Sequence, residues 1–351
     1  MNHATYIHRC FDLARLGAGS VAPNPMVGAV FVYENRIIGE GWHRQYGHAH
    51  AEVNAVQSVK PEDLHLIGKS TLYVSLEPCC IHGNTPPCTD LILRHRIPKV
   101  VISCLDQTPA VSGRGVEILR NAGVEVLTGI LKEPGEALSA FRNTFVTAQR
   151  PYIILKFARS KDGFMGVPGK QVWISNEYSQ RLVHKWRSEI DAFLVGTRTA
   201  LTDNPNLTNR FWFGKSPLRI VLDRNLSIPG HYFLLDKTSN TWVITEVDKP
   251  SENPNLVFVN LKFDETFLPG LLHRLFEHKI SSMMVEGGAA TLASFIESGW
   301  WDEARIFTGN KTLGAGIEAP IIGGLLKDER PVGGDTLTIF TNPNPRPLNF
   351  A

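Results

Sequence analysis

The feature that most constrains the fold of this chain is an alternation of strand-like and helix-like segments that occurs twice. The first series ends near Gln149, Arg150 and Pro151, where a proline interrupts the helical periodicity, and a second series starts directly after it. Such alternation is typical of a β-sheet covered by helices. A chain of 351 residues is also longer than a single hydrophobic core usually supports. We therefore predict two α/β domains, over residues 1–147 and 151–351.

The periodicity of the apolar residues places elements within each series. In the first domain, a helix over about 2–17 leads into a hairpin over 28–43 that turns around Glu34 and Asn35. The other elements predicted there are a helix from His50, a strand at 71–76, a helix from Cys88, a strand at 99–105, a helix near 115–121, a strand at 124–129 and a helix at 133–146. The second domain is predicted to contain strands at 151–160, 191–196, 218–223, 241–246, 256–260, 281–288 and 303–309, and helices at 176–190, 267–279 and 290–299. The last twenty or so residues, rich in Asn and Pro, are expected to form an edge strand and a tail.

The bulk composition argues against several classes of protein. A net charge of +2 gives no support to a nucleic-acid binder with a strong phosphate-tracking surface, whereas small acidic substrates are compatible with it. No apolar stretch approaches the roughly 18 residues that a membrane span requires, and the N-terminus lacks the layout of a signal peptide. Five cysteines, an odd number and mostly local, do not indicate a secreted disulfide framework. We therefore expect a cytoplasmic protein that has no nucleic-acid or membrane partner.

A group of histidine and cysteine residues in the first domain indicates a metal site. His50 opens a predicted helix, Cys79 follows a predicted strand, and Cys88 starts another helix. The two cysteines belong to the run EPCCIHGNTPPC at 77–88. One imidazole and two thiolates that leave a fourth position for water are a ligand set suited to catalytic zinc. Backbone N–H groups at the start of a helix would favour the thiolate form of Cys88 and also of Cys79.

Glu52 lies two residues after His50, where its carboxylate can reach a zinc-coordinated water without binding the ion itself. Zinc lowers the pKa of such a water towards roughly 7, and a nearby glutamate can take its proton and return it to a leaving group. The order H-x-E, then P-C, then a later cysteine is the pattern of zinc deaminases. Here the usual Cys-x-x-Cys is replaced by eight residues between Cys79 and Cys88.

The remaining cysteines and histidines have simpler interpretations. Cys10 and Cys104 are expected to be core thiols, because a single buried cysteine is more often packing than ligand. Cys80 is expected to be structural, because adjacent side chains of an extended segment point to opposite faces. His48 and His82 lie near the proposed metal, where a histidine is as often a supporting or solvated group as a functional one.

The motifs of the second domain are weaker when taken alone. VEGGAATL at 285–292 predicts a strand, a glycine turn and a helix start, which together can bind a phosphate or form a plain strand-to-helix turn. It does not match the G-x-G-x-x-G fingerprint of dinucleotide-binding domains. The stretch at 196–210 offers Asp203 as a catalytic group, although Asp-Asn-Pro is commonly only a turn.

Together, these motifs resemble a bacterial bifunctional family of riboflavin biosynthesis, in which a diaminohydroxyphosphoribosylaminopyrimidine deaminase is joined to a 5-amino-6-(5-phosphoribosylamino)uracil reductase. PNPMVGAV at 23–30, HAHAEVNA at 48–55 and LEPCCIHGNTPPC at 76–88 are similar to its deaminase half. The motifs similar to its reductase half are LKFARSKDG at 155–163, VWIS at 172–175, VHKWR at 183–187, the stretch at 196–210 and VEGGAATL at 285–292. The resemblance implies a cytidine-deaminase-like α/β/α domain followed by a dihydrofolate-reductase-like α/β domain that uses NADPH.

The resemblance also implies a role for each matching residue. In the deaminase half, His50, Cys79 and Cys88 would hold one zinc ion per chain, Glu52 would shuttle the proton, and the pyrimidine pocket would be lined by Asn24, His43 and His82. Contacts with NADPH are implied for Ala158, Trp173, Thr199, Asp203, Gly288, Ala289, Ala290, Thr291, Leu292, Ala293 and Ser294. Contacts with the phosphoribosyl substrate are implied for Gln171, Arg187, Leu207, Arg210 and Glu286. Asp203 would lie between the nicotinamide and the sugar carbon.

The chain departs from the family pattern at four positions. Asn84 stands where the family usually has Arg or Lys before Thr-Pro-Pro, at a position expected to contact phosphate. Phe164 replaces an arginine, Gln171 a serine, and Asn204 the second aspartate of Asp-Asp-Pro. These substitutions bear on substrate and cofactor contacts and remove none of the residues named as catalytic.

The sequence therefore predicts a two-domain enzyme, a homo-oligomer by family resemblance, that performs consecutive steps on small phosphoribosylaminopyrimidines. The first step is a hydrolytic deamination, and the second is an NADPH-dependent reduction of the ribosyl group to a ribityl group. One alternative is a nucleic-acid base deaminase fused to an accessory domain, which would need a basic groove with interleaved aromatic residues. Another is a zinc-stabilised scaffold without turnover, against which Glu52 argues, because a closed structural site does not need it.

Overall fold

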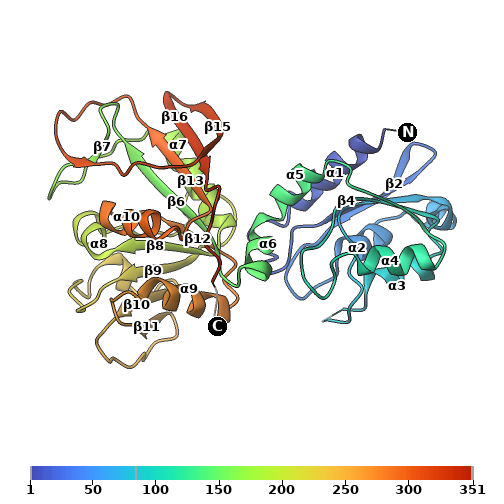
Figure 1. Cartoon of the computed structure of the whole chain (residues 1–351), viewed down its shortest axis with the longest axis horizontal. Coiled ribbons are helices and arrows are strands. Elements are labelled where there is room, and N and C mark those ends of the chain that lie inside the picture. Colours follow the sequence, from blue (N-terminus) through green and yellow to red (C-terminus); the bar gives the residue numbers. More distant parts are fainter. Residues whose placement is uncertain (1, 84, 349–351) are drawn as a thin grey trace. The chain divides into compact units, whose positions relative to one another are not determined.

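The structure of the chain, a computed structural model, describes residues 2–83 and 85–348. It divides into two compact units, Met1–Thr147 and Ala148–Ala351, and each has its own sheet and covering helices (Figure 1). Within the described ranges, no helix is both long enough and apolar enough to cross a membrane.

The first unit is built on a five-stranded sheet in the order β2-β1-β3-β4-β5. Strand β1 (Gly28–Tyr33) lies antiparallel to β2 (Arg36–Trp42) and to β3 (Thr71–Leu76), while β4 (Lys99–Cys104) and β5 (Glu125–Thr128) continue parallel to β3. The predicted β1–β2 turn is confirmed, since its two central residues have positive φ angles, as a tight hairpin turn requires. The carboxyl ends of β3 and β4 consequently meet at one edge of the sheet.

Helices cover both faces of this sheet. On one face lie α1 (His3–Arg15) and α5 (Lys132–Leu138), and on the other lie α2 (Ala51–Gln57), α3 (Cys88–Arg94) and α4 (Arg114–Asn121). Side chains along β1 alternate between the two cores, as a strand buried on both sides requires. Ala29 and Phe31 belong to the core under α2, whereas Val30 and Val32 belong to the core under α1. The unit therefore has the predicted α/β/α layers.

The helix predicted at 133–146 is wrong in one respect, because the structure contains two helices there. Ser139 separates α5 from α6 (Ala140–Thr147), and its φ of −93° and ψ of 7° lie outside α-helical values. Helix α6 takes a different direction from α5 (Figure 1). A 3-10 helix at Pro61–Lys69 was not predicted either.

The second unit is built on a nine-stranded sheet in the order β11-β10-β9-β8-β12-β6-β13-β16-β15. Neighbouring strands from β11 to β13 are parallel, and β16 is antiparallel to both β13 and β15. The strands are β6 (Tyr152–Arg159), β8 (Ala192–Gly196), β9 (Leu218–Leu222), β10 (Thr241–Thr245), β11 (Leu256–Asn260), β12 (Ser282–Val285), β13 (Glu303–Thr308), β15 (Leu325–Val332) and β16 (Asp335–Thr341). A separate two-stranded sheet pairs β7 (Phe164–Gly166) with β14 (Ile317–Glu318).

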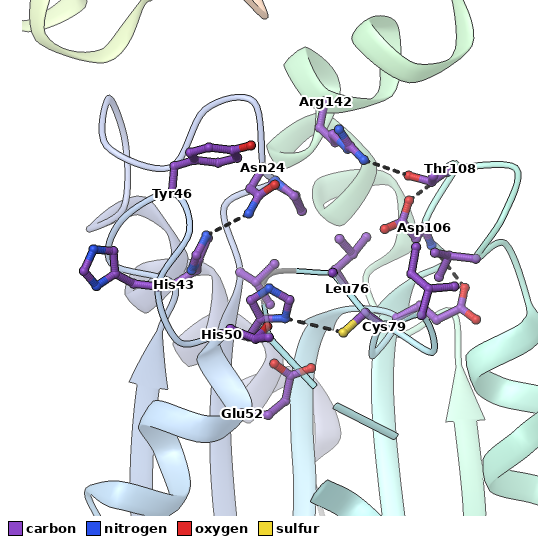
Figure 2. Close-up of a pocket in the computed structure, with 18 of the residues that line it drawn as sticks. Asn24, His43, Tyr46, His50, Glu52, Leu76, Cys79, Asp106, Thr108 and Arg142 are labelled. Carbon is purple, nitrogen blue, oxygen red and sulfur yellow. Dashed lines mark hydrogen bonds between the residues drawn. The ribbon is translucent and has the colours of Figure 1, made fainter. Parts of the chain in front are cut away.

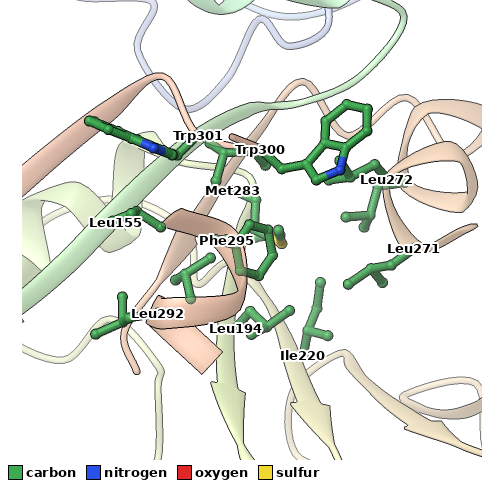
Figure 3. Close-up of a cluster of buried hydrophobic side chains, with 14 of the residues drawn as sticks. Leu155, Leu194, Ile220, Leu271, Leu272, Met283, Leu292, Phe295, Trp300 and Trp301 are labelled. Atoms are coloured by element: carbon green, nitrogen blue, oxygen red, sulfur yellow. The ribbon is translucent and has the colours of Figure 1, made fainter. Parts of the chain in front are cut away.

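Helices also cover both faces of the large sheet. The helices α9 (Phe267–Glu277) and α10 (Ala289–Ser298) pack on one face, where Leu272 and Phe295 belong to a buried apolar cluster (Figure 3). On the other face, α7 (Glu177–Glu189) stacks Trp186 against Phe307 of β13, with ring centroids 5.6 Å apart. The Asn176 side chain starts α7 by accepting a hydrogen bond from Ser179 N–H.

Strands β7 and β14 and a 3-10 helix at Phe233–Leu235 were not predicted, and two further parts of the second unit differ from the prediction. The C-terminal region forms two strands, of which β16 lies inside the sheet and β15 is the edge. The segment after β8 forms α8 (Thr197–Asp203), where no helix was predicted. Asn204 ends α8 with a φ of 41°, a left-handed conformation that asparagine tolerates better than most residues.

A buried ion pair fixes the start of the second unit. Arg150 donates to both carboxylate oxygens of Asp302, at 2.6 and 2.9 Å, and the side chains are only 1% and 5% exposed. Asp302 also accepts the Ile153 N–H at 2.7 Å.

We expect Asp302→Ala to lower the free energy of unfolding of this unit by about 3–5 kcal/mol, because it leaves a buried guanidinium unpaired. Urea unfolding followed by tryptophan fluorescence measures the loss. The matched control is Asp328→Ala, which breaks an exposed pair with Arg330 and should change stability by about 0.5 kcal/mol or less. Equal losses in the two variants would contradict the prediction.

Candidate active sites

A pocket of about 330 Å³ opens in the first unit, at the edge where β3 and β4 end (Figure 2). Residues from loops and helix starts line it, as is usual at the carboxyl ends of parallel strands. Those among them that the sequence had singled out for the metal site, the proton transfer or the pyrimidine pocket are Asn24, His43, His50, Glu52 and Cys79.

Three ligand atoms converge at the floor of this pocket. His50 Nδ1 lies 3.4 Å from Cys79 Sγ and 3.4 Å from Cys88 Sγ, and the three atoms all lie within 4.8 Å of one another. His50 is the N-cap residue of α2, and Cys88 is the first residue of α3. The segment after β3 brings Cys79 to them. One nitrogen and two sulfurs at this spacing match a tetrahedral zinc site with a fourth position open.

The protonation of the two sulfurs also fits a divalent cation. The backbone N–H of Cys88, at the start of α3, donates to Cys79 Sγ at 3.3 Å. This amide therefore favours the thiolate form of Cys79 and not that of Cys88. The pKa of Cys79 is lowered to about 4, chiefly by a hydrogen bond from the Cys88 thiol and further by His50. The same contact, together with burial, raises the pKa of Cys88. Zinc binding at this site would release the proton that remains on the Cys88 thiol.

The other cysteines lie outside this ligand group. Cys10 and Cys104 are 0% and 2% exposed, which confirms that they are core thiols. Cys80, next to Cys79, is only partly buried and is not one of the converging ligands.

Glu52 lies in the first turn of α2 and is 3% exposed. Its carboxylate lies beside the ligand atoms and lines the pocket without belonging to the ligand group (Figure 2). Burial raises the pKa of Glu52, and the charge of Cys79 raises it further. A buried carboxyl group that faces an open metal position is suited to exchange a proton with the reacting molecule.

Asn24 and His43 form a fixed polar wall of the pocket. His43 Nδ1 lies 3.1 Å from the Ala49 carbonyl oxygen, to which it can only donate, so Nε2 is free to accept from Asn24 Nδ2 at 3.2 Å. Burial lowers the pKa of His43, which favours this neutral form. The remaining Asn24 amide atoms can therefore recognise a heterocycle.

The structure gives less support to the remaining residue of the pocket prediction. His82 is exposed and is not among the described residues that line the pocket, so its role stays a prediction. Asn84, the departure expected to affect a phosphate contact, lies outside the described residues.

The pocket also contains residues that sequence reasoning missed. Tyr46, Asp106, Thr108 and Arg142 line its upper part (Figure 2). None belongs to a motif quoted above. A cation inside a mostly apolar helix segment, AFRNTFV, was the available signal for Arg142.

In the second unit, charged residues gather around the carboxyl end of β12. Arg187 of α7 contacts Glu286, which follows β12, with Nη2 and Oε2 3.1 Å apart and both side chains about one-tenth exposed. The Arg210 backbone N–H donates to His184 Nδ1 at 2.9 Å, which brings the two predicted arginines into one region. Burial, together with both arginines, lowers the pKa of His184 to about 4, so this histidine is neutral near pH 7.

Lys156 of β6 belongs to the same cluster and was not predicted. Burial lowers its pKa, while Glu286 opposes that shift. Burial alone would raise the pKa of Glu286, but Arg187 and Lys156 outweigh it and hold the carboxyl below its usual range. The cluster therefore has one carboxylate among several cations, an arrangement that suits an anionic substrate.

Two groups of predicted NADPH residues, Thr199 and the turn at 288–294, follow the neighbouring strands β8 and β12. A Cβ on Gly288 would lie 2.9 Å from Thr199 Oγ1, and one on Gly196 would lie 2.5 Å from Thr291 Oγ1. The starts of α8 and α10 are therefore close to one another, since β8 and β12 are adjacent and parallel. Backbone N–H groups of a helix start such as that of α10 can bind phosphate.

The other predicted residues of this unit lie on several elements. Ala158 is near the end of β6, Asp203 ends α8, and Leu207 is buried with a φ of 56°. Trp173 and Gln171 are exposed on the segment after β7. Desolvation by the surrounding protein raises the pKa of Asp203.

These features define the class of protein. An α/β/α unit that brings a histidine and two cysteines together beside a buried glutamate has the layout of a zinc-dependent deaminase. The model of the cytidine and deoxycytidylate deaminase zinc-binding region matches residues 1–104. The RibD C-terminal domain model matches residues 151–333.

Whole-chain comparisons agree with both matches. The chain is 39% identical to the riboflavin biosynthesis protein RibD of Aquifex aeolicus over 91% of its length and 90% of the relative, and 31% identical to that of Escherichia coli over 90% and 89%. It superposes on a diaminohydroxyphosphoribosylaminopyrimidine deaminase/5-amino-6-(5-phosphoribosylamino)uracil reductase from Thermotoga maritima with a TM-score of 0.88, at 35% identity and with 97% and 98% of the two chains covered. The chain belongs to the RibD family of riboflavin biosynthesis proteins.

Proposed function

We propose that this chain is the bifunctional enzyme that deaminates a diaminohydroxyphosphoribosylaminopyrimidine and then reduces 5-amino-6-(5-phosphoribosylamino)uracil with NADPH. The observation that carries the proposal is the convergence of His50, Cys79 and Cys88 beside the buried Glu52. Family membership supports the same pair of activities. We assign the deamination to residues 1–147 and the reduction to residues 151–351.

In the first unit, His50, Cys79 and Cys88 would hold zinc, which when bound supplies the Lewis acidity that makes water a nucleophile near neutral pH. Asn24, oriented by its hydrogen bond with His43, holds the pyrimidine over the pocket floor. Glu52 takes up the proton of the attacking water and delivers it to the departing amine. The substrate thereby loses ammonia and gains a carbonyl oxygen.

In the second unit, NADPH when bound would supply a hydride to C1′ of the ribosyl group, and the ribityl chain results when the C1′–O4′ bond breaks and O4′ takes up a proton. The turn at 288–294, with Ala158, Trp173 and Thr199, positions the cofactor. Arg187 and Arg210 bind the substrate phosphate, and Gln171, Leu207 and Glu286 complete the substrate contacts. Asp203 would lie between the nicotinamide and the sugar, where its carboxyl group would orient the reacting carbon and donate the proton to the sugar oxygen. The partly desolvated carboxyl of Asp203 supports the proton-donor role.

We also propose that the enzyme works in the cytoplasm as a homo-oligomer. Five free cysteines, two of them proposed zinc ligands, are best preserved in a reducing compartment. The oligomer is proposed from family resemblance.

A coupled assay tests the proposed function. The full chain is incubated with the diaminopyrimidine phosphate and NADPH, and ammonia and nicotinamide absorbance are followed together. We expect ammonia release to precede NADPH oxidation, with one equivalent of each. Ammonia release without NADPH oxidation would leave only the deaminase assignment, and release of neither would overturn both.

Zinc content is a second expected result. We expect about one zinc per purified chain by atomic emission, because three converging donors complete most of a tetrahedral site. Cys88→Ser should remove most of that zinc and abolish ammonia release. The control Cys80→Ser, which alters a cysteine outside the ligand group, should keep the metal. Retention of full zinc in Cys88→Ser would contradict the ligand assignment.

A further inference from the structure

We propose that Arg142 binds the phosphate group of the deaminase substrate, an inference that rests on the function proposed above. In a phosphoribosylaminopyrimidine, the amino group to be removed and the phosphate are at opposite ends of the molecule. The ring end must lie over His50, Cys79 and Cys88. The phosphate therefore needs a cation elsewhere in the same pocket.

Arg142 lies where that cation is needed. It belongs to the first turn of α6, and Figure 2 shows it beside Thr108, at the opposite end of the pocket from His50 and Cys79. Among the described residues that line the pocket, Arg142 is the only arginine or lysine. A phosphate monoester carries nearly two negative charges near neutral pH, so its burial in this pocket requires such a partner.

The guanidinium of Arg142 has unused hydrogen-bonding capacity. Nη1 donates to the Pro23 carbonyl oxygen at 3.3 Å, and Nη2 donates to Thr108 Oγ1 at 3.2 Å. Within residues 2–83 and 85–348, the buried Nε has no hydrogen-bond partner and no carboxylate forms an ion pair with the side chain. Five N–H donors are available on a guanidinium, so several remain for a ligand. The two existing bonds hold the group in place before the ligand arrives, which favours bidentate phosphate recognition.

Two neighbours of Arg142 suit a sugar phosphate. The Thr108 hydroxyl accepts from Arg142 and can donate its own proton to a phosphate oxygen. Asp106, which accepts the Thr108 N–H at 2.7 Å, opposes the pKa depression that burial imposes on Arg142. The Asp106 carboxylate would repel a phosphate in direct contact, but it can accept hydrogen bonds from the adjoining ribose hydroxyls.

The sequence of this chain gives Arg142 added weight. The loop at 77–88, EPCCIHGNTPPC, contains no arginine or lysine, so that loop offers no such cation to the phosphate. Arg142 comes from a different element, α6, that lines the same pocket. We infer that α6 supplies the charge that the loop lacks.

The competing explanation is that Arg142 only tethers the Pro23 loop to Thr108. The two explanations differ in their dependence on the substrate's phosphate. A tether affects every substrate alike, whereas a phosphate ligand affects only phosphorylated ones.

The experiment compares the full-length wild type and Arg142→Met on the phosphorylated substrate and on its dephosphorylated riboside, with ammonia release as the signal. We expect KM for the phosphorylated substrate to rise on the order of ten- to a hundredfold, as the loss of a charge-assisted hydrogen-bonded contact implies. KM for the riboside should stay within about twofold, since no phosphate contact is lost. Ribose 5-phosphate should inhibit the wild type competitively and Arg142→Met more weakly by a similar factor.

Matched variants separate binding from folding. Arg142→Lys keeps the positive charge but lacks the planar guanidinium that binds phosphate through two hydrogen bonds, so its KM for the phosphorylated substrate should be intermediate. Arg15→Met, which removes an exposed arginine of α1, should leave both KM values unchanged. Equal changes for both substrates, or none in Arg142→Met and Arg142→Lys, would overturn the phosphate assignment. Failure of the wild type to release ammonia from either substrate would instead overturn the proposed function.

Discussion

The Glu52→Gln variant should retain its zinc and its fold but lose ammonia release by about 10²- to 10⁴-fold, the usual contribution of a general acid–base residue. Glutamine has nearly the same shape as glutamate, so the buried site beside His50 is kept. The glutamine side chain, however, cannot take up or deliver a proton. Because burial raises the pKa of Glu52, a neutral side chain at this position should cost little stability.

Three measurements on Glu52→Gln distinguish a role of Glu52 in proton transfer from a role in zinc binding or folding. Zinc per chain and the thermal unfolding midpoint should match the wild type, and NADPH oxidation on supplied deaminated substrate should be unchanged. The control Glu62→Gln alters an exposed carboxylate of the same unit and should be silent in all assays. Full deamination by Glu52→Gln would remove the proton-transfer role proposed for Glu52.

The Asp203→Ala variant should lose NADPH oxidation but keep ammonia release. We expect the rate of NADPH oxidation to fall on the order of a hundredfold, because the variant loses the carboxyl group proposed to face the reacting sugar carbon. Ammonia release should be unchanged, since the first unit has its own pocket and core. Stopped-flow absorbance at the nicotinamide band measures the first quantity, and an ammonia electrode measures the second.

Asp203→Asn separates the proton role from packing. It keeps the size of the side chain, so a loss as large as that of Asp203→Ala would assign the effect to the carboxyl proton. Asp248→Ala removes an exposed aspartate of the same unit and serves as the silent control. If Asp203→Ala stopped both reactions in a folded protein, the independence of the two sites would be wrong.

Much of the fold could be predicted from the sequence because its strands are buried and its helices are amphipathic. The order of elements from α1 to β13 follows the apolar periodicity closely. The errors occurred where that signal is weak. Ser139 interrupts a pattern that reads as one helix, and α8 is too short and polar to stand out. Strand β15 is largely exposed, so no burial pattern marks it.

The sites could be predicted only where local motifs carry them. His50 and Glu52 belong to one helix start, and the cysteines lie within one short run, so type and spacing suffice. Arg142 reaches Thr108 across 34 positions of sequence, and no local pattern encodes that contact. Lys156 offered a usable signal, a cation within the buried strand β6, that sequence reasoning did not use.

The position of Arg142 on α6 has a practical consequence for the design of shorter versions of this protein. The zinc-region match ends at residue 104, yet the pocket also draws on the segment after β4 and on Arg142. A fragment cut soon after residue 104 would keep every metal donor while forfeiting one entire wall of the cavity. A truncated protein intended to contain only the deaminase unit should therefore end after Thr147 and not at residue 104.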